Sequence, residues 1–403
     1  MTHRIKKEFV IILALLISLT ALSIDTMLPA LPMIASDLGV VVDNDRQLVL
    51  TVLFLGLAIG QLVYGPISDS FGRKIPVLIG LGLFIGGSMM SALSTSFEVL
   101  LASRFIQGFG IAGPRTLAMA IVRDQYKGNT MASIASLIMM VFILVPMLAP
   151  MIGQGILMIS TWRMIFWFFV GLGLITAIWF WIRQTETLPR ERRHPLSVKA
   201  MLRAAREVMT NRISAGHTVC MSLVFGAFVG FLSSCQQILQ EQYQTGDLFV
   251  FYFGALACGV GFASFINSRL VMRFSMVVLC RTAISSQVVL SFILLGLTIL
   301  GGPKLWQLML LLMAIFFFIG LLFGNLNAMA MTPMGHIAGM ASAIIGSISS
   351  LISLFFGYQI GRAYDGTLYP LVGGFIVLGI AALLVLKWAN RGVDPAVYSD
   401  TGH

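Results

Sequence analysis

The stretch that decides the fold of this chain lies between two long apolar runs and reads Gly65-Pro66-Ile67-Ser68-Asp69-Ser70-Phe71-Gly72-Arg73-Lys74. Glycine allows close helix contacts and unusual backbone angles, so Gly65 suits a helix contact and Gly72 suits a tight turn. Asp69 precedes Arg73 and Lys74, so charges of both signs meet where an apolar run ends. We predict two helices joined here by a short charged loop, although such a turn could occur in any membrane protein.

The rest of the chain is a series of similar apolar runs. Of its 403 residues, 58% are hydrophobic and only 10% are charged, whereas soluble domains carry about 25% charged residues. A bilayer core about 30 Å thick needs roughly 20 apolar residues for each helical crossing. We therefore predict an all-α membrane protein with twelve transmembrane helices, at roughly 9–32, 46–67, 75–95, 97–120, 133–156, 162–183, 214–236, 247–268, 276–299, 304–327, 338–361 and 368–390.

Lysine and arginine are distributed unevenly between the two sets of alternating loops. With twelve spans, one set of loops and both tails hold 20 of the 26 basic residues, the other set holds 4, and Arg104 and Arg115 fall inside a span. Because basic loops stay in the cytoplasm, we expect both termini to be cytoplasmic. The net charge of +10 lies in these short loops, so we expect a lipid bilayer, and no nucleic acid, as partner.

The longest polar stretch divides the twelve spans into six and six. It predicts an N-terminal six-helix bundle at 1–183, a cytoplasmic linker at 184–212 and a C-terminal bundle at 213–403. Apolar residues recur in the linker at helical spacing, which favours an amphipathic helix on the membrane surface over a plain solvated linker: Val198, Met201, Leu202, Ala205, Val208 and Met209. Two such bundles are typical of carriers whose substrate site lies near the midplane.

The decapeptide at 65–74 resembles the G-x-x-x-D-x-x-G-R-K signature of the major facilitator superfamily, and it lies between spans two and three as in that family. The resemblance implies the major facilitator fold and transport by alternating access. It also implies a charge cluster that forms in one conformation and breaks in another. We expect this conformational switch to comprise Gly65, Asp69, Gly72, Arg73, Lys74, Arg123 and Asp124.

Further segments are similar to the drug:proton antiporters of the Bcr/CflA type. Residues 25–32 read D-x-x-L-P-A-L-P and residues 104–110 read R-x-x-Q-G-x-G, while 336–343 also fits the group. The fifth span has Pro146, Pro150 and Gly153, like the antiporter signature of that helix. The likeness implies a multidrug exporter of the bacterial inner membrane, powered by the proton gradient without a cofactor. Residues 267–273 repeat the first-half signature poorly, which puts a symmetric gating mechanism in doubt.

Asp25 is the acidic residue that we place well inside a span, and a carboxylate in hydrocarbon indicates function by default. It lies seven residues before Pro32, and Arg104 lies seven residues after Phe97. At 1.5 Å per residue both lie about 10 Å below the outer boundary, so an ion pair is possible. We predict that Asp25 and Arg104 couple protons to transport. The alternatives are a structural Asp25 and an Arg104 bonded to backbone carbonyls.

The substrate cavity is harder to predict from sequence, because aromatic and methionine side chains adapt to varied ligands but also pack against lipid and helices. Amides inside a span need partners or a wet cavity, yet they also join helices to one another. Candidates for the cavity are Gln107, Met147, Phe228, Phe231, Gln236, Tyr252, Asn325, Asn327 and Phe356. Since few acidic residues line the spans, neutral or zwitterionic drug-like molecules are as plausible as cations.

Other functional classes fit the sequence less well. The five histidines form no ligand cluster and the four cysteines form no CxxC pair, so we expect neither a metal site nor an enzyme. The sequence contains no G-x-x-x-x-G-K-[ST] loop, so it does not indicate an ATP-driven pump. A metabolite exporter or an uptake carrier on the same fold remains the alternative to a drug exporter, because fold does not fix substrate or direction. We expect a monomer.

Overall fold

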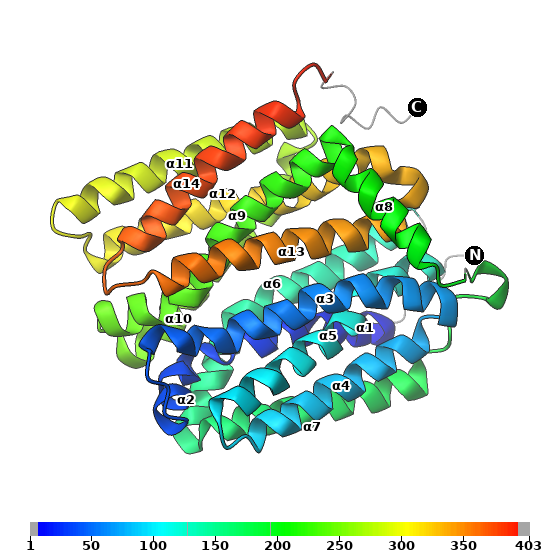
Figure 1. Ribbon diagram of the computed structural model, residues 1–403, viewed down its shortest axis with the longest axis horizontal. Helices are drawn as coiled ribbons and strands as arrows, with labels where there is room; N and C mark the ends of the chain where they lie inside the picture. The colour runs from blue at the N-terminus through cyan, green and yellow to red at the C-terminus, as the bar shows by residue number, and fades with distance from the viewer. Residues whose placement is uncertain (1–6, 127, 194, 394–403) are drawn as a thin grey trace. The chain divides into compact units, whose positions relative to one another are not determined.

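The computed structural model describes residues 7–126, 128–193 and 195–393, and these form helices joined by short loops. The chain folds as two compact units, Met1–Met201 and Leu202–His403. Figure 1 shows long helices running side by side within each unit. The expectation for the N-terminal tail before Lys7, which carries Arg4 and Lys6, lies outside the described residues.

The first unit contains six long helices and several short ones. The long helices are α1 (Lys7–Asp25), α3 (Leu48–Phe71), α4 (Lys74–Ala92), α5 (Phe97–Gln125), α6 (Gly128–Ile159) and α7 (Trp162–Arg183). Between them lie η1 (Leu28–Ala30), α2 (Leu31–Asp37) and η2 (Asp43–Gln47), and η3 (Arg190–Arg192) follows α7. The linker helix α8 (Val198–Thr210) crosses the boundary between the units.

The second unit repeats the plan of six long helices. They are α9 (Arg212–Gln236), α10 (Phe249–Leu270), α11 (Met276–Ile299), α12 (Leu305–Met331), α13 (Ala338–Arg362) and α14 (Tyr369–Ala389). A π-helical turn η4 (Gln237–Gln242) extends α9, and η5 (Gly246–Leu248) and η6 (Thr332–Ile337) precede α10 and α13.

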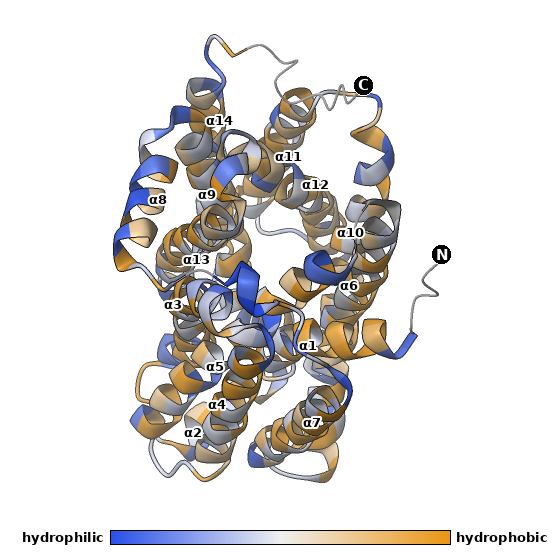
Figure 2. Cartoon of the chain, turned by 90° about the vertical axis from the view of Figure 1, so that its right-hand side faces the viewer, coloured by the Kyte–Doolittle hydropathy of each residue, from blue (hydrophilic) through white to orange (hydrophobic). Residues whose placement is uncertain are grey.

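The predicted count of twelve spans is confirmed. By length and composition the described residues contain ten candidate spans, of which Leu305–Arg362 holds both α12 and α13, and α6 adds the apolar segment Leu144–Ile159. Figure 2 shows hydrophobic residues along these helices and hydrophilic residues concentrated at helix ends and on α8. A bilayer requires this pattern, because a helix satisfies its own backbone hydrogen bonds where no water can.

The first predicted span is not the single helix over 9–32 that its apolar run predicts. Helix α1 stops at Asp25, and the chain continues through η1 and α2. Pro29 lies in η1 and Pro32 is the second residue of α2, and a proline lacks the N–H that an uninterrupted helix needs. The prolines therefore end α1 within the first apolar run, directly after its buried carboxylate.

Glycine brings α3 and α5 into close contact in the first unit. A β-carbon at Gly56 would lie 2.2 Å from the Phe105 carbonyl oxygen, and one at Gly108 would lie 2.0 Å from the Leu53 carbonyl oxygen. Small residues permit this backbone-to-backbone packing between membrane helices. The close approach holds α5, which carries Arg104, firmly against its neighbours.

Candidate functional site

Asp25 is the last residue of α1 and is only 5% exposed. Its side chain forms no hydrogen bond or ion pair with any residue in the described part of the chain. The hydroxyl groups of Thr20 and Thr26 are also buried and without a partner there. A buried polar group without a partner is energetically unfavourable and calls for an explanation. The last turns of α1 therefore hold several buried polar groups without hydrogen-bond partners in the described part of the chain.

Arg104 is fully buried on α5 and is bound on all sides. Its Nε donates to the Val49 carbonyl oxygen at 3.0 Å and its Nη2 donates to the Ser23 carbonyl oxygen at 2.8 Å. Its Nη1 donates to Gln107 Oε1 at 2.5 Å, and its guanidinium carbon lies 5.7 Å from the centre of the Phe166 ring. Arg104 therefore joins α1, α3 and α5 through backbone and side-chain oxygens.

The ion pair considered for Asp25 and Arg104 is not formed in this structure. As the equal depths predicted, Arg104 lies near the end of α1. Its guanidinium binds the carbonyl of Ser23, two residues before Asp25, and not the Asp25 carboxylate. The physical reason is the break in α1: the last four carbonyls of a helix have no intrahelical partner. Arg104 satisfies one of these carbonyls, as the structural alternative for this residue supposes.

Gln107 does not face a cavity in this structure. It is fully buried, accepts the hydrogen bond from Arg104 and donates through Nε2 to Ser88 Oγ at 2.7 Å. Both of its polar atoms are thus engaged, and the residue extends the Arg104 network to α4. In this structure Gln107 links helices through hydrogen bonds and does not line a cavity, in contrast to the prediction from sequence.

The antiporter-like segment of α6 lies against the break in α1. A β-carbon at Gly153 would lie 2.1 Å from the Thr26 carbonyl oxygen and 3.2 Å from Pro29 Cγ. Pro146 and Pro150 both lie inside α6, and a proline leaves the carbonyl of the preceding turn unbonded. Met147 is half-buried between them. This part of α6 and the end of α1 thus form one contact, with Asp25 at its edge.

The turn between α3 and α4 carries the predicted charge cluster. Arg73 binds Asp69 at 2.6 Å, Asp124 at 2.9 Å and Ser68 Oγ at 2.6 Å. Gly72 has a φ of 94°, a conformation that favours glycine. Gly65 lies in α3, where its carbonyl accepts a hydrogen bond from Ser68. The structure brings Asp69, Gly72, Arg73 and Asp124 together at this turn.

Two residues of the expected switch lie at the edge of this cluster or outside it. Lys74 donates through Nζ to the Trp181 carbonyl oxygen at 2.8 Å. Arg123 is exposed and donates back to the Met119 carbonyl oxygen in its own helix at 3.3 Å. Arg123 forms no ion pair with the described acidic residues, so its predicted place among them is not what this structure shows.

Glu186 completes the cluster and was missed by the sequence analysis. Its carboxylate accepts hydrogen bonds from the backbone N–H groups of Arg73 at 2.8 Å and Lys74 at 3.2 Å, and from that of Leu188 at 2.9 Å. Burial alone would raise the pKa of Glu186, but these hydrogen bonds outweigh burial and lower that pKa. The only signal was an acidic residue in a basic linker.

The charges of the cluster also stabilise Arg73 in its protonated form. Burial favours the neutral guanidinium, but Asp124 and Asp69 outweigh this effect and raise the pKa of Arg73 above its ordinary value. Thr187 Oγ1 adds a hydrogen bond to Asp124 at 3.1 Å. We name Asp69, Arg73, Asp124 and Glu186 the turn cluster; it ties together the ends of α3 and α5 and the segment after α7.

The cavity candidates of the second unit have different environments. Phe231 is buried, with its ring centre 4.7 Å from that of Phe316, so it packs in the core. Asn325 is buried and exchanges two hydrogen bonds with Asn267, at 2.8 and 3.3 Å, and therefore joins α12 to α10. Asn267 lies at the end of the predicted span 247–268, and α10 includes it. These two candidates are structural in this conformation.

The remaining candidates are one buried glutamine and several side chains that stay partly or fully exposed. Gln236 donates to Gln240 and Glu241 while its own Oε1 is buried without a partner in the described part of the chain. Phe228, Tyr252 and Phe356 are half-buried, and Asn327 is exposed. Phe228 stacks on Phe225 in an aromatic group that also includes Phe316 and Phe323.

Comparisons with known proteins agree with this architecture. The chain is 33% identical to an uncharacterized MFS-type transporter, YdgK, of Bacillus subtilis, over 85% of each chain. It is 30% identical to a bicyclomycin resistance protein homolog of Haemophilus influenzae, over 95% of this chain and 96% of that one. The second relative confirms the resemblance to Bcr/CflA-type transporters.

A solved structure shows the same fold at a greater distance in sequence. The D-xylose-proton symporter superposes with a TM-score of 0.73 at 15% identity, covering 94% of this chain and 97% of that one. This likeness confirms the predicted fold. Residues 13–358 match the Major Facilitator Superfamily as a family. With that match over most of its length, and with its charged α3–α4 turn in place, the chain belongs to the Major Facilitator Superfamily.

Proposed function

We propose that this chain exports small drug-like molecules across the bacterial inner membrane in exchange for protons, by alternating access. The observation that carries the proposal is the buried carboxylate of Asp25 at the break in α1, directly before the Thr26 carbonyl on which Gly153 packs. An ionised carboxylate is unfavourable at such a place, and protonation removes its charge. Proton occupancy therefore changes the free energy of the α1–α6 contact.

Arg104 has a positioning role in this proposal. It holds the end of α1 through the Ser23 carbonyl and leaves the carboxylate of Asp25 uncommitted. A permanent ion pair would favour the ionised acid in every state, whereas an unpaired acid exchanges its proton more readily. Proton uptake from the outside and release to the inside would then alternate with drug binding next to the end of α1.

The turn cluster has the second role. It joins three segments of the first unit through ion pairs and hydrogen bonds at the end that the lysine and arginine distribution assigns to the cytoplasm. Charge networks of this kind can be rearranged as a set when helices move. We propose that the cluster stabilises one of the two access states and loosens in the other.

The relatives favour export over uptake. The Haemophilus relative is named for resistance to bicyclomycin, and resistance follows when a carrier lowers the internal drug concentration. The symporter neighbour shares the fold alone, so uptake or metabolite export on this scaffold is the alternative. We further propose that the carrier needs no cofactor beyond the proton gradient, acts as a monomer and has both termini in the cytoplasm.

An efflux assay with a chemically diverse drug panel tests the proposed function. Cells that overproduce the protein should accumulate less of at least one compound than deletion cells, and a proton-collapsing agent should abolish the difference. Equal accumulation across the panel, with faster entry of a metabolite, would support the alternative instead. The direction of transport in inverted vesicles separates the two outcomes.

A further inference from the structure

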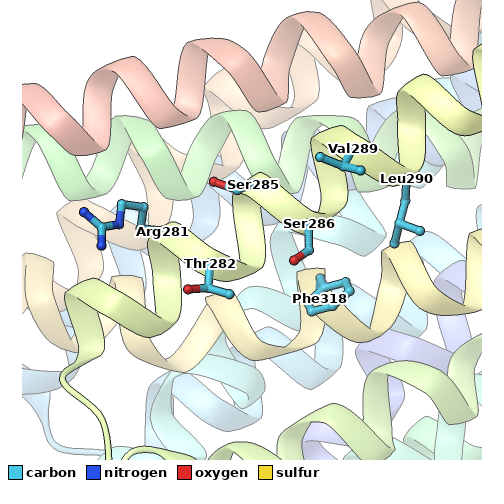
Figure 3. Close-up of a pocket in the computed structure, with 7 residues that line it drawn as sticks. All are labelled: Arg281, Thr282, Ser285, Ser286, Val289, Leu290 and Phe318. Carbon is cyan, nitrogen blue, oxygen red and sulfur yellow. The ribbon is translucent and has the colours of Figure 1, made fainter.

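A groove on the second unit is separate from the residues discussed so far. It has a volume of about 540 Å³ and is lined by six residues of α11 and by Phe318 of α12. Helix α11 packs on α12 and α14, and several of the lining residues are exposed, Val289 to 58%. Figure 3 shows Thr282, Ser286 and Leu290 pointing towards the side on which Phe318 lies.

The groove changes from polar to apolar along its length. Two neighbouring rows of α11 line it at four-residue spacing, Arg281-Ser285-Val289 and Thr282-Ser286-Leu290. Each row passes from a charged or hydroxyl-bearing residue through a serine to a hydrocarbon side chain. At 1.5 Å per residue, the nine steps from Arg281 to Leu290 cover about 14 Å. The groove therefore has a polar end and an apolar end, as an amphiphilic molecule does.

The polar end of the groove has no partner among the residues that the structure describes. Neither the Arg281 guanidinium nor the hydroxyls of Thr282, Ser285 and Ser286 form hydrogen bonds or ion pairs in the described part of the chain. By contrast, Ser291 and Thr298 of the same helix bond to the carbonyl four residues back. Exposed polar groups on a membrane helix need a partner from outside the chain, because hydrocarbon supplies none.

The charge at this end of α11 is positive. Residues 267–281 contain Arg269, Arg273 and Arg281 and no acidic residue. Arg281 lies five residues after Met276, where α11 begins, about 8 Å along the axis. That depth is close to the headgroup layer, which an arginine side chain reaches easily.

We propose that this groove binds an anionic phospholipid of the cytoplasmic leaflet. The phosphate would lie against Arg281, the glycerol esters against Thr282, Ser285 and Ser286, and an acyl chain along Val289, Leu290 and Phe318. The assignment depends on the orientation of the membrane helices and on the groove itself, and it does not depend on which compound is exported. A bound lipid would fill the space beside α12 and stiffen its contact with α11.

Native mass spectrometry of the full-length protein in detergent tests the proposal. Phosphatidylglycerol and phosphatidylcholine with identical acyl chains are titrated in parallel. Both lipids carry a phosphate, but the choline cation cancels its charge in phosphatidylcholine, whereas phosphatidylglycerol keeps a net negative charge. One arginine near an anionic membrane surface corresponds to about a fivefold preference, so phosphatidylglycerol should bind about fivefold more tightly. The preference should disappear in Arg281→Gln and persist in Arg281→Lys.

Two further variants separate this site from general charge effects. Lys387→Gln removes an exposed positive charge in the last turn of α14, outside the groove, and should keep the preference. Ser286→Phe fills the groove and should weaken the binding of both lipids. The proposal is overturned if Arg281→Gln keeps the preference or if inorganic phosphate displaces the lipid. Displacement by a transported drug would also overturn it, because the groove would then be a substrate site.

Discussion

Gly153 of α6 lies so close to Thr26 that a β-carbon on it would be 2.1 Å from the Thr26 carbonyl oxygen. Thr26 directly follows Asp25, so the close approach fixes the backbone next to the buried carboxylate. A real β-carbon does not tolerate such a distance to a backbone oxygen. Any side chain at position 153 must therefore separate α6 from the end of α1.

Gly153→Ala should impair transport and stability together. Inserting a methyl group into a tight contact destabilises a fold by about 1–3 kcal/mol, and here the displaced element carries Asp25. Gly155→Ala is the matched control, because nothing lies within 4 Å of a β-carbon at Gly155. Thermal unfolding in detergent and efflux in cells measure both effects. Equal behaviour of the two alanine variants would contradict the packing account.

Arg104 should be sensitive even to a conservative change. Arg104→Lys keeps the charge but cannot reach three separated acceptors, the Val49 and Ser23 carbonyls and Gln107. Each buried acceptor left without a donor destabilises the fold by about 1–3 kcal/mol. We expect a lowered melting temperature for the lysine variant and a larger loss for Arg104→Gln.

A double variant distinguishes the carbonyl anchor from an ion pair. If Arg104 served mainly to balance the charge of Asp25, Asp25→Asn would restore stability to Arg104→Gln, since both charges would be gone. The structure predicts no such rescue, because the guanidinium binds the Ser23 carbonyl. Recovery of the melting temperature in the double variant would show that the pair exists.

Gly72→Ala should disturb the turn cluster for two reasons. A non-glycine residue at a φ of 94° is strained by about 1–3 kcal/mol, and a β-carbon would lie 2.3 Å from Glu186 Oε2. Gly366→Ala provides the control, because Gly366 has a φ of 86° and nothing within 4 Å of its β-carbon. The loss of stability in Gly72→Ala beyond that of Gly366→Ala measures the contact with Glu186.

The turn cluster should weaken in acid. The pKa of Glu186 is lowered in the folded protein from its ordinary value of 4.5. A group with a lowered folded pKa contributes stability above its unfolded pKa and loses that contribution as the pH falls through its folded pKa. The difference in melting temperature between wild type and Glu186→Gln should therefore be full near neutral pH and shrink below about pH 4.5. A difference that grows in acid would contradict the assignment.

Much of the fold could be predicted because it depends on local patterns. Apolar runs of span length predict helices wherever a bilayer is the solvent, and the glycine and charges of the 65–74 stretch identify the α3–α4 turn. The break in α1 was harder, since hydropathy stays high through Pro29 and Pro32. Those two prolines were the available signal for the break, because they interrupt the helix even though the apolar run continues.

The contacts of the site could not be predicted, because they depend on distant backbone atoms. Arg104 binds the carbonyl of Ser23, and a sequence does not show which carbonyls a helix break leaves free. Glu186 meets Arg73 across 113 residues of chain. Equal depth predicted that Arg104 lies near the end of α1, but depth alone cannot choose between a carboxylate and a carbonyl as its partner.

The central claim is that Asp25 carries the coupled proton, and Asp25→Asn in proteoliposomes tests it most directly. The variant should lose drug uptake driven by a pH gradient while it still exchanges labelled for unlabelled drug without a gradient, because the fold and the drug site persist. Asp43→Asn, a change at an acidic residue in the loop before α3, should behave as wild type. Gradient-driven transport by Asp25→Asn at the wild-type rate would contradict the account.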